Sequence, residues 1–286
     1  MSGHLLHRQP ILRRPDGIGG ALPALTLIAL FFVVPVLALL LRSVTEPVPG
    51  LYNYAMLFGD GTYARVFFNT FLVATVVTAV TVIVAFPVAW MLAIMPPALG
   101  SIVFGIIILS MWTNLLTRTY AWMVLLQRTG VINRTLMDIG LISEPLPLIN
   151  NLTGVTIGMV YIMLPFMILP LVGTLRAIDP MTLRAAALCG ASPFEAFRRI
   201  LLPLSLPGIA AGGLMVFVMS LGYFVTPTLL GGTSNMMLAA LIAQMIQSLL
   251  NWGLGSAAAF ILLLVTMALY ALQLRLVGAK HMTGGI

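Results

Sequence analysis

Long stretches without a charged residue alternate with short polar segments along this chain of 286 residues. The uncharged stretches cover residues 17–41, 66–117, 145–175 and 200–274. An apolar run longer than about 18 residues is typical of a transmembrane helix, because a charged side chain near the bilayer centre costs several kcal/mol. The pattern therefore predicts an all-α integral membrane protein.

Two of these stretches are too long for one membrane helix and must contain breaks. Residues 66–117 break at Pro96-Pro97, since consecutive prolines cannot continue a helix. Residues 200–274 break over Thr226–Gly253, and the apolar piece Met237–Leu250 inside this break is too short to cross, so an interfacial or re-entrant segment is expected. Six transmembrane helices are predicted, over Ile18–Leu41, Phe67–Met95, Ser101–Leu126, Leu152–Leu175, Leu202–Val225 and Leu254–Leu274.

The first span has full membrane length, whereas the apolar region of a signal peptide has about 7–15 residues, so we interpret it as a retained anchor. The expected organisation is a tail over residues 1–17, the first helix over 18–41 and a loop over 42–65. A core of five helices follows over 66–277 and includes a polar loop over 176–201, and a second tail covers 278–286.

Arginine and lysine are distributed unevenly between the two sides that this topology defines. Because basic residues favour the cytoplasmic side, both tails and the polar loop are predicted to be cytoplasmic, and residues 42–65 periplasmic. The protein would then be a multi-pass component of a bacterial inner membrane. The cytoplasmic set is Arg8, Arg13, Arg14, Arg176, Arg184, Arg198, Arg199, Arg275 and Lys280; the opposite set is Arg42, Arg65, Arg128 and Arg134, with Arg118 just inside a span.

Composition supports the membrane interpretation and argues against several functions. Hydrophobic residues make up 60% and charged residues 7% of the chain, whereas soluble domains have about 25% charged residues. The net charge of +7 is dispersed around the spans, which indicates topology rather than nucleic-acid binding. The single Cys189 excludes a disulfide framework within the chain. The sequence has no phosphate-cradling glycine-rich loop with lysine and no metal-ligand cluster, so no cofactor and no catalysis are expected of this chain.

All the charges between Pro145 and Leu274 fall in the polar loop, whose sequence predicts two short helices. Asp179-Pro180 is typical of a helix start and Gly190 of a left-handed helix stop. Ser192 and Glu195 have the spacing of a capping box that begins a second helix. The charges are Arg176, Asp179, Arg184, Glu195, Arg198 and Arg199.

These two helices are expected to lie across the membrane surface, and Pro203 to begin the next membrane helix. Leu188, Phe194 and Phe197 would then be available to a groove in a protein partner. The alternative is an amphipathic connector seated among lipid headgroups.

The loop resembles the EAA loop of ATP-binding-cassette importer permeases. The resemblance rests on Arg184-Ala-Ala followed by Gly190, and on Ile200-x-Leu-Pro203 further along. In that family the loop forms a coupling helix that docks in a cleft of the cytoplasmic ATPase subunit. The family's usual glutamate is Arg184 here, which implies a compensating change in the cognate ATPase. The coupling residues that the resemblance implies are Arg184, Ala185, Ala186, Gly190, Ala191, Ser192, Phe194, Ile200 and Pro203.

Other segments resemble the spermidine/putrescine type of these permeases. They are Phe68-Asn69-Thr70, Pro87-Val88-Ala89-Trp90, Thr117–Trp122, Leu126–Asn133, Met163–Phe166 and Leu229–Gly232. The resemblance implies a type I ABC importer permease fold and places this chain as the first of two permease subunits. It implies as partners a second permease, two cytoplasmic ATPase subunits, a periplasmic solute-binding protein and membrane lipid. The implied substrate is a polyamine such as spermidine or putrescine, although the family also transports other organic cations, opines and phosphonates.

Polar and aromatic residues within the spans are the candidates for contact with substrate. Arg118 is the sharpest, because an ionisable group inside a span faces the bundle or an aqueous path by default. It could instead extend to the outer interface, with Tyr120 and Trp122 as interfacial aromatics. The full candidate set is Asn69, Thr113, Asn114, Arg118, Tyr120, Trp122, Tyr161, Tyr223 and Phe224.

The uncharged candidates also have structural alternatives. Asn69, Thr113 and Asn114 could form hydrogen bonds between helices, and Tyr223-Phe224 could shape a gate or simply pack. No Asp or Glu lies within any predicted span, so a dication would depend on aromatic faces and amide oxygens, or on acids of a partner chain. A stand-alone secondary carrier or channel is the alternative class, but carriers usually show intramembrane acids and internal repeats, and neither is clear here.

Overall fold

The computed structural model describes residues 17–232 and 235–283, and every regular element within these ranges is helical. The expected tail over residues 1–17 falls almost entirely outside them, as do residues 284–286 of the other tail. The elements are α1 (Gly17–Ile28), the π-helical turn η1 (Ala29–Val33), α2 (Val34–Thr45), α3 (Tyr52–Gly59), α4 (Gly61–Ile94), α5 (Pro97–Met111), α6 (Leu115–Leu126), α7 (Val131–Asp138), α8 (Leu152–Arg176), α9 (Pro180–Leu188), α10 (Pro193–Ala196), the π-helical turn η2 (Phe197–Leu201), α11 (Leu202–Leu221), α12 (Val225–Leu230), α13 (Leu238–Gln247) and α14 (Trp252–Thr283).

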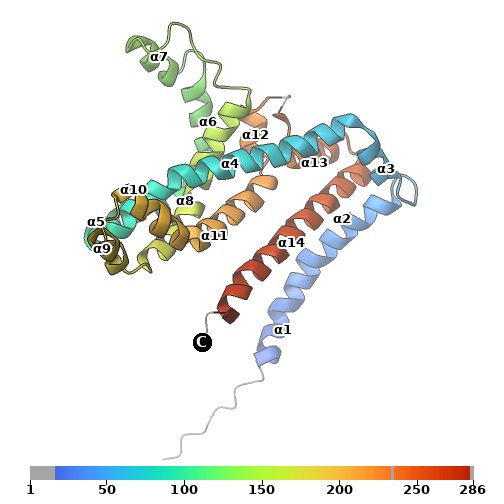
Figure 1. Ribbon diagram of the computed structural model, residues 1–286. Helices are drawn as coiled ribbons and strands as arrows, with labels where there is room; N and C mark the ends of the chain where they lie inside the picture. Colours follow the sequence, from blue (N-terminus) through green and yellow to red (C-terminus); the bar gives the residue numbers. More distant parts are fainter. Residues whose placement is uncertain (1–16, 233–234, 284–286) are drawn as a thin grey trace, which may run out of the picture.

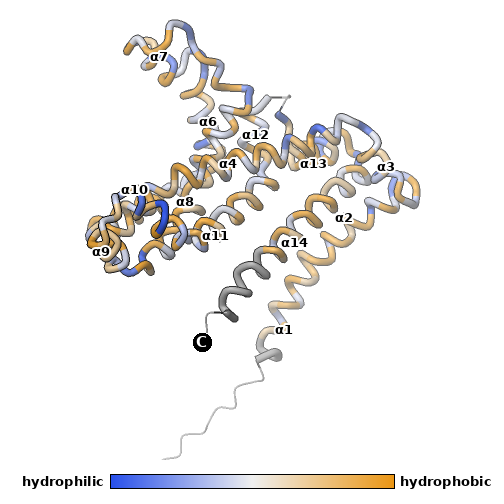
Figure 2. The backbone as a smooth tube through the Cα atoms, in the orientation of Figure 1, coloured by the Kyte–Doolittle hydropathy of each residue, from blue (hydrophilic) through white to orange (hydrophobic). Residues whose placement is uncertain are grey.

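Five helical segments are long and apolar enough to cross a membrane, and a bent pair of helices makes a sixth candidate. The predicted all-α membrane fold is therefore confirmed, and Figure 2 shows the apolar residues along these segments. The five segments are Ala21–Thr45, Gly61–Ile94, Leu152–Arg176, Pro193–Leu221 and Trp252–Leu272.

The expected helix over Ser101–Leu126 is wrong as a continuous element. α5 ends at Met111, and the segment Leu115–Asp138 that follows is bent from α5 by 96°. The break has a local cause at Asn114, whose side-chain oxygen accepts hydrogen bonds from the amides of Leu116 (2.9 Å) and Thr117 (3.4 Å). An N-cap of this kind satisfies amides that have no partner within the helix, so it starts α6 in a new direction.

α11 begins at Leu202 with Pro203 in its first turn, as predicted, but it is not separated from the helix before it, because α10, η2 and α11 form one helical segment, Pro193–Leu221. The second helix of the polar loop thus continues directly into the membrane span. A proline cannot donate to the carbonyl four residues earlier, and its ring crowds that carbonyl. The π-helical turn η2 ends two residues before Pro203, and η1 likewise ends two residues before Pro35, so each turn widens the helix where the proline requires it.

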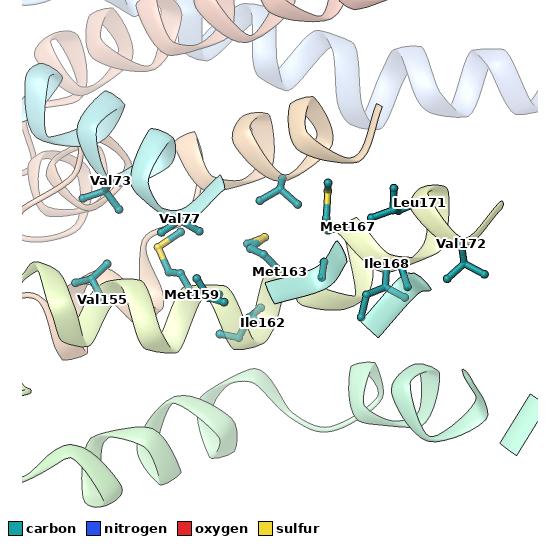
Figure 3. Close-up of a cluster of buried hydrophobic side chains, with 14 of the residues drawn as sticks. Val73, Val77, Val155, Met159, Ile162, Met163, Met167, Ile168, Leu171 and Val172 are labelled. Atoms are coloured by element: carbon teal, nitrogen blue, oxygen red, sulfur yellow. The ribbon is translucent and has the colours of Figure 1, made fainter. Parts of the chain in front are cut away.

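The main core is formed by α4, α8 and α11, with α8 the most deeply buried of the long spans. Figure 3 shows side chains of α8, such as Met159 and Met163, beside Val73 and Val77 of α4. α11 approaches α8 closely at Gly212, which has no side chain. A Cβ at this position would lie only 2.6 Å from the sulfur of Met167. Small residues at such a crossing allow two membrane helices to pack closely.

A second core joins α3, the start of α4, α13 and α14. The short apolar helix α13 falls within the predicted interfacial piece 237–250, and its buried residues Leu238, Leu241 and Met245 pack in this core. α14 also runs beside α2, and this pair leans away from the α4–α8–α11 bundle (Figure 1). At the start of α4, the Asp60 carboxylate accepts a hydrogen bond from the Thr62 amide at 2.8 Å, which lowers the pKa of Asp60.

Candidate functional site

The polar loop forms the two helical starts that its sequence predicts. The Asp179 carboxylate accepts a hydrogen bond from the amide of Met181 at 2.8 Å and so caps α9. Gly190 ends that helix with φ +84°, and a Cβ built on it would meet nothing within 4 Å. Glycine is therefore required there for its backbone conformation and not for space.

Ser192 and Glu195 form the predicted capping box at the start of α10. The Ser192 hydroxyl accepts from the Glu195 amide at 3.3 Å, and the Glu195 carboxylate accepts from the Ser192 amide at 3.1 Å. Glu195 also lies 4.0 Å from Arg199, one turn further along. The helix that enters the membrane thus has a fixed start next to the end of α9.

The apolar side chains of this loop are exposed to different extents. Leu188 is 90% and Phe194 69% exposed, so both are available to a partner. Phe197 packs edge-on against Phe86 of α4, with ring centroids 5.6 Å apart, and is still 37% exposed, so one side of its ring contacts the bundle while the other is accessible. It therefore fixes the loop to the bundle.

The motif residues of the loop all lie between α9 and the first turn of α11, and Figure 2 shows hydrophilic residues near α10. Arg184 is exposed on α9 and has no ion-pair partner among the described side chains. The placement of the set is Arg184, Ala185 and Ala186 on α9, Gly190 and Ala191 in the turn, Ser192 and Phe194 at the start of α10, Ile200 in η2 and Pro203 in the first turn of α11.

A polar group lies at the junction of α6, α11 and α12. Thr119 and Thr226 are buried, and their hydroxyls are 3.1 Å apart. The side chain of Tyr223 lies close to those of Thr226 and Arg118. The Nε of Arg118 is buried and has no hydrogen-bond partner among the described residues. A buried donor without a partner costs free energy, so its presence calls for an explanation, of which a functional role is one.

An aromatic pair extends this group toward α8. The rings of Trp122 and Tyr161 meet edge-to-face, with centroids 5.6 Å apart. Four of the predicted path residues, Arg118, Trp122, Tyr161 and Tyr223, thus come from α6, α8 and the α11–α12 junction. The structure shows how these four side chains contact one another and their neighbours. That they contact substrate stays a prediction.

The other predicted path residues lie elsewhere or have local roles. Thr113 donates to the carbonyl of Ser110 at 2.6 Å, and Asn114 caps α6, so the interhelical bonds considered for this pair are wrong. Asn69 lies on α4 beside Thr70, and Tyr120 is 48% exposed on α6.

A cavity of about 450 Å³ lies between α12 and α13 and was missed by the sequence reasoning. Phe224 is the one predicted path residue in its lining, and Gln244, Gln247 and Ser248 add polar groups. The signal was present in the sequence, because Gln244 and Gln247 are three apart and therefore share a face of α13. The hydropathy averaged over α13 is apolar, and this average hides the two glutamines on one face.

Comparison with known proteins assigns most of the chain to one family. Residues 61–279 match the model of the binding-protein-dependent transport system inner membrane component. The match begins at the first residue of α4 and includes the polar loop and the α12–α13 region.

Individual relatives are similar over much of their length. The spermidine/putrescine transport system permease protein PotB of Haemophilus influenzae is 36% identical over 205 residues, 72% of this chain and 71% of the relative. PotB of Escherichia coli is 34% identical over 215 residues, 75% of this chain and 78% of the relative. The inner membrane ABC transporter permease protein YdcU of Escherichia coli is 37% identical over 195 residues, 63% of this chain and 61% of the relative.

Two solved structures share the fold at low sequence identity. One is a bacterial ABC transporter involved in the import of the acidic polysaccharide alginate, with a TM-score of 0.64 and 17% identity, covering 90% of this chain and 94% of that one. The other is a bacterial alginate ABC transporter in complex with an alginate pentasaccharide-bound periplasmic protein, with a TM-score of 0.69 and 16% identity, covering 89% and 91%.

Proposed function

The chain belongs to the family of binding-protein-dependent transport system inner membrane components, and from this premise we propose that it is the permease subunit of an ATP-driven importer of spermidine/putrescine type. The observation that carries the proposal is the 34–36% identity to PotB proteins over about three quarters of the chain. The substrate would be a small polyamine that crosses the inner membrane into the cell.

The proposal includes the partners of such an importer. This chain would pair with a second permease, receive substrate from a periplasmic binding protein and couple to two cytoplasmic ATPase subunits, with lipid around the bundle. ATP would be bound and hydrolysed on the ATPase subunits, so this chain would need no cofactor. The polar loop supports the coupling role because exposed Leu188 and Phe194 lie on a loop that Phe197 fixes to the bundle.

A movement of the polar loop would be transmitted to the membrane spans through the helix that connects them. α9 and α10 are joined by the Gly190 turn, and α10 continues through η2 into α11 as one helical segment. A displacement of the loop by a closing ATPase dimer would therefore act directly on α11, which packs against α8 and α4. Such rigid-body transmission is how packed helices convert a local push into alternating access.

The chemistry of the path fits an organic cation in part. Trp122, Tyr161 and Tyr223 offer aromatic faces, and Gln244 and Gln247 offer amide oxygens. The acids that select a polycation would then belong to the binding protein or the second permease. The positive charge of Arg118 would oppose tight binding of a polyamine at this point. The polyamine would therefore pass this point without being held there.

Arg118 also favours one alternative within the same importer class. Its unpaired Nε would suit a solute with an acidic group, such as an opine or a phosphonate. A secondary carrier or channel has no comparable support, because the family match covers the whole bundle from α4 to α14.

The orientation is part of the proposal. We place the polar loop and both tails in the cytoplasm on the excess of Arg and Lys on that side. The structure supports the placement of both tails on one side of the membrane, since the start of α1 and the end of α14 both lie at the end of these helices opposite α3 and α13 (Figure 1).

The substrate is tested with the complete complex in nanodiscs, together with its binding protein. Native mass spectrometry identifies the ligand that co-purifies with the binding protein, and ATPase activity is then measured with that protein loaded or empty. The proposal predicts a polyamine and stimulation by the loaded form. A co-purified opine or phosphonate that alone stimulates the ATPase would favour the anionic alternative and reject the polyamine.

A further inference from the structure

A cavity of about 500 Å³ lies behind α9, at the end of the bundle where α4 and α8 finish. Trp90 and Ile94 line it from α4, Arg176 from the last residue of α8, and Leu183 and Arg184 from α9. Because α4 and α8 are membrane spans that end there, the cavity sits at the boundary between hydrocarbon and water.

The lining carries two positive charges and no acid. Arg176 donates to the carbonyl of Leu92 at 3.3 Å, which holds its guanidinium against the end of α4. Neither arginine forms an ion pair with any acid among the described side chains. Asp179 is the acid nearest in sequence, and its carboxylate is engaged in capping α9. The cavity therefore attracts an anion.

The remaining lining is apolar and continues onto the outside of the bundle. Trp90 and Leu183 pack partly against the main core, and Ile94 is 64% exposed at the rim. Met91, one turn before, is 47% exposed, as expected for a helix surface in contact with lipid. A soluble anion would satisfy the arginines and leave this apolar wall uncovered, whereas an amphiphile satisfies both.

We propose that this cavity binds the phosphate headgroup of an anionic phospholipid. Arg176 and Arg184 would contact the phosphate, and an acyl chain would lie along Ile94 and Met91 of α4. Basic pockets between membrane helices recognise anionic headgroups in this way. Because Arg184 belongs to α9, the bound lipid would also fix the position of that helix. That consequence for coupling rests on the proposed function, whereas lipid binding does not.

The test uses native mass spectrometry of the complete transporter complex released from nanodiscs that contain phosphatidylglycerol in phosphatidylcholine. The variants are Arg176→Gln and Arg184→Gln, with Arg198→Gln as the matched control, since Arg198 is an exposed arginine of the same loop outside the cavity. Each cavity variant should retain about fivefold less phosphatidylglycerol, and the control as much as the wild type. Arg176→Lys keeps the charge and should retain most of it.

Competition with soluble glycerol 3-phosphate separates a lipid site from a site for free phosphate. The proposal predicts that millimolar glycerol 3-phosphate leaves the lipid bound. Displacement by this anion, or equal lipid retention in all variants, would overturn it. Loss of ATPase subunits from the Arg184→Gln complex with lipid retention unchanged would instead assign that arginine to the ATPase contact and would also overturn it.

Discussion

Gly190 and Ser192 stop one helix and start the next within three residues, Gly190 through its backbone conformation and Ser192 through its hydroxyl, which accepts from the Glu195 amide. Such local signals could be predicted from the sequence, because a cap depends on residues only a few positions apart. Phe197 could not be placed, since its partner Phe86 is distant in sequence and the contact exists only in the folded bundle. The same reason hid the bond between Thr119 and Thr226.

Replacement of Gly190 by alanine should impair coupling without a steric clash. The positive φ costs an L-residue about 1–2 kcal/mol, although a Cβ there would meet nothing within 4 Å. Transport and substrate-stimulated ATPase activity should fall, while membrane insertion is unchanged. Gly190→Asn is the control, because asparagine tolerates this conformation better. Equal losses in both variants would show that the turn conformation is not what matters.

At the scale of elements, the apolar stretches predicted where spans lie but not how they bend. Hydropathy placed one helix over Ser101–Leu126, whereas the Asn114 cap divides it. Pro203 lies in the first turn of α11 as predicted, but η2 joins this helix to α10 without the expected break. Both differences have one cause: hydropathy averages over many residues and does not report whether a single polar or cyclic residue interrupts the helix. The contact between α13 and α4 includes a local feature of this kind, the hydroxyl of Thr70.

Thr70 should determine how firmly α13 is held on α4. Its buried hydroxyl accepts a hydrogen bond from the Leu238 amide at 2.8 Å and donates to the carbonyl of Val66 at 2.7 Å. Thr70→Val keeps the shape and leaves the buried amide unsatisfied, which costs about 1–3 kcal/mol. Thermal unfolding of the complex should shift down, and hydrogen exchange at Leu238 should speed up. Thr70→Ser should behave as the wild type; if Thr70→Val does too, the bond has no structural role.

At the scale of the whole molecule, the sequence predicted the fold class and the polar loop, and the family match covers residues 61–279. The arrangement of α2 and α14 beside the bundle could not be predicted, because periodicity reports one helix at a time. Contacts between helices could not be predicted either: four of the candidate path residues come together from three parts of the chain, and Gln244 and Gln247 line a cavity with Phe224 that the sequence did not indicate. Which residues contact substrate stays a prediction.

Topology can be tested on the chain as it is, because Cys189 is its single cysteine and is exposed. A membrane-impermeant maleimide added to intact spheroplasts should not label Cys189, and should label it after lysis. Leu51→Cys in a Cys189→Ser background is the control, since Leu51 is 70% exposed and predicted to be periplasmic. It should react without lysis. Labelling of Cys189 from outside would reverse the orientation.

The central claim, a polyamine-type importer permease, is tested most directly by uptake. Cells that lack other polyamine transporters express this chain with its second permease, ATPase and binding protein, and accumulation of radiolabelled putrescine and spermidine is measured. The account predicts uptake that requires this chain and disappears when the ATPase is inactivated by substitution of its catalytic glutamate. Absence of polyamine uptake by an assembled complex, or uptake that persists without ATP hydrolysis, would contradict it.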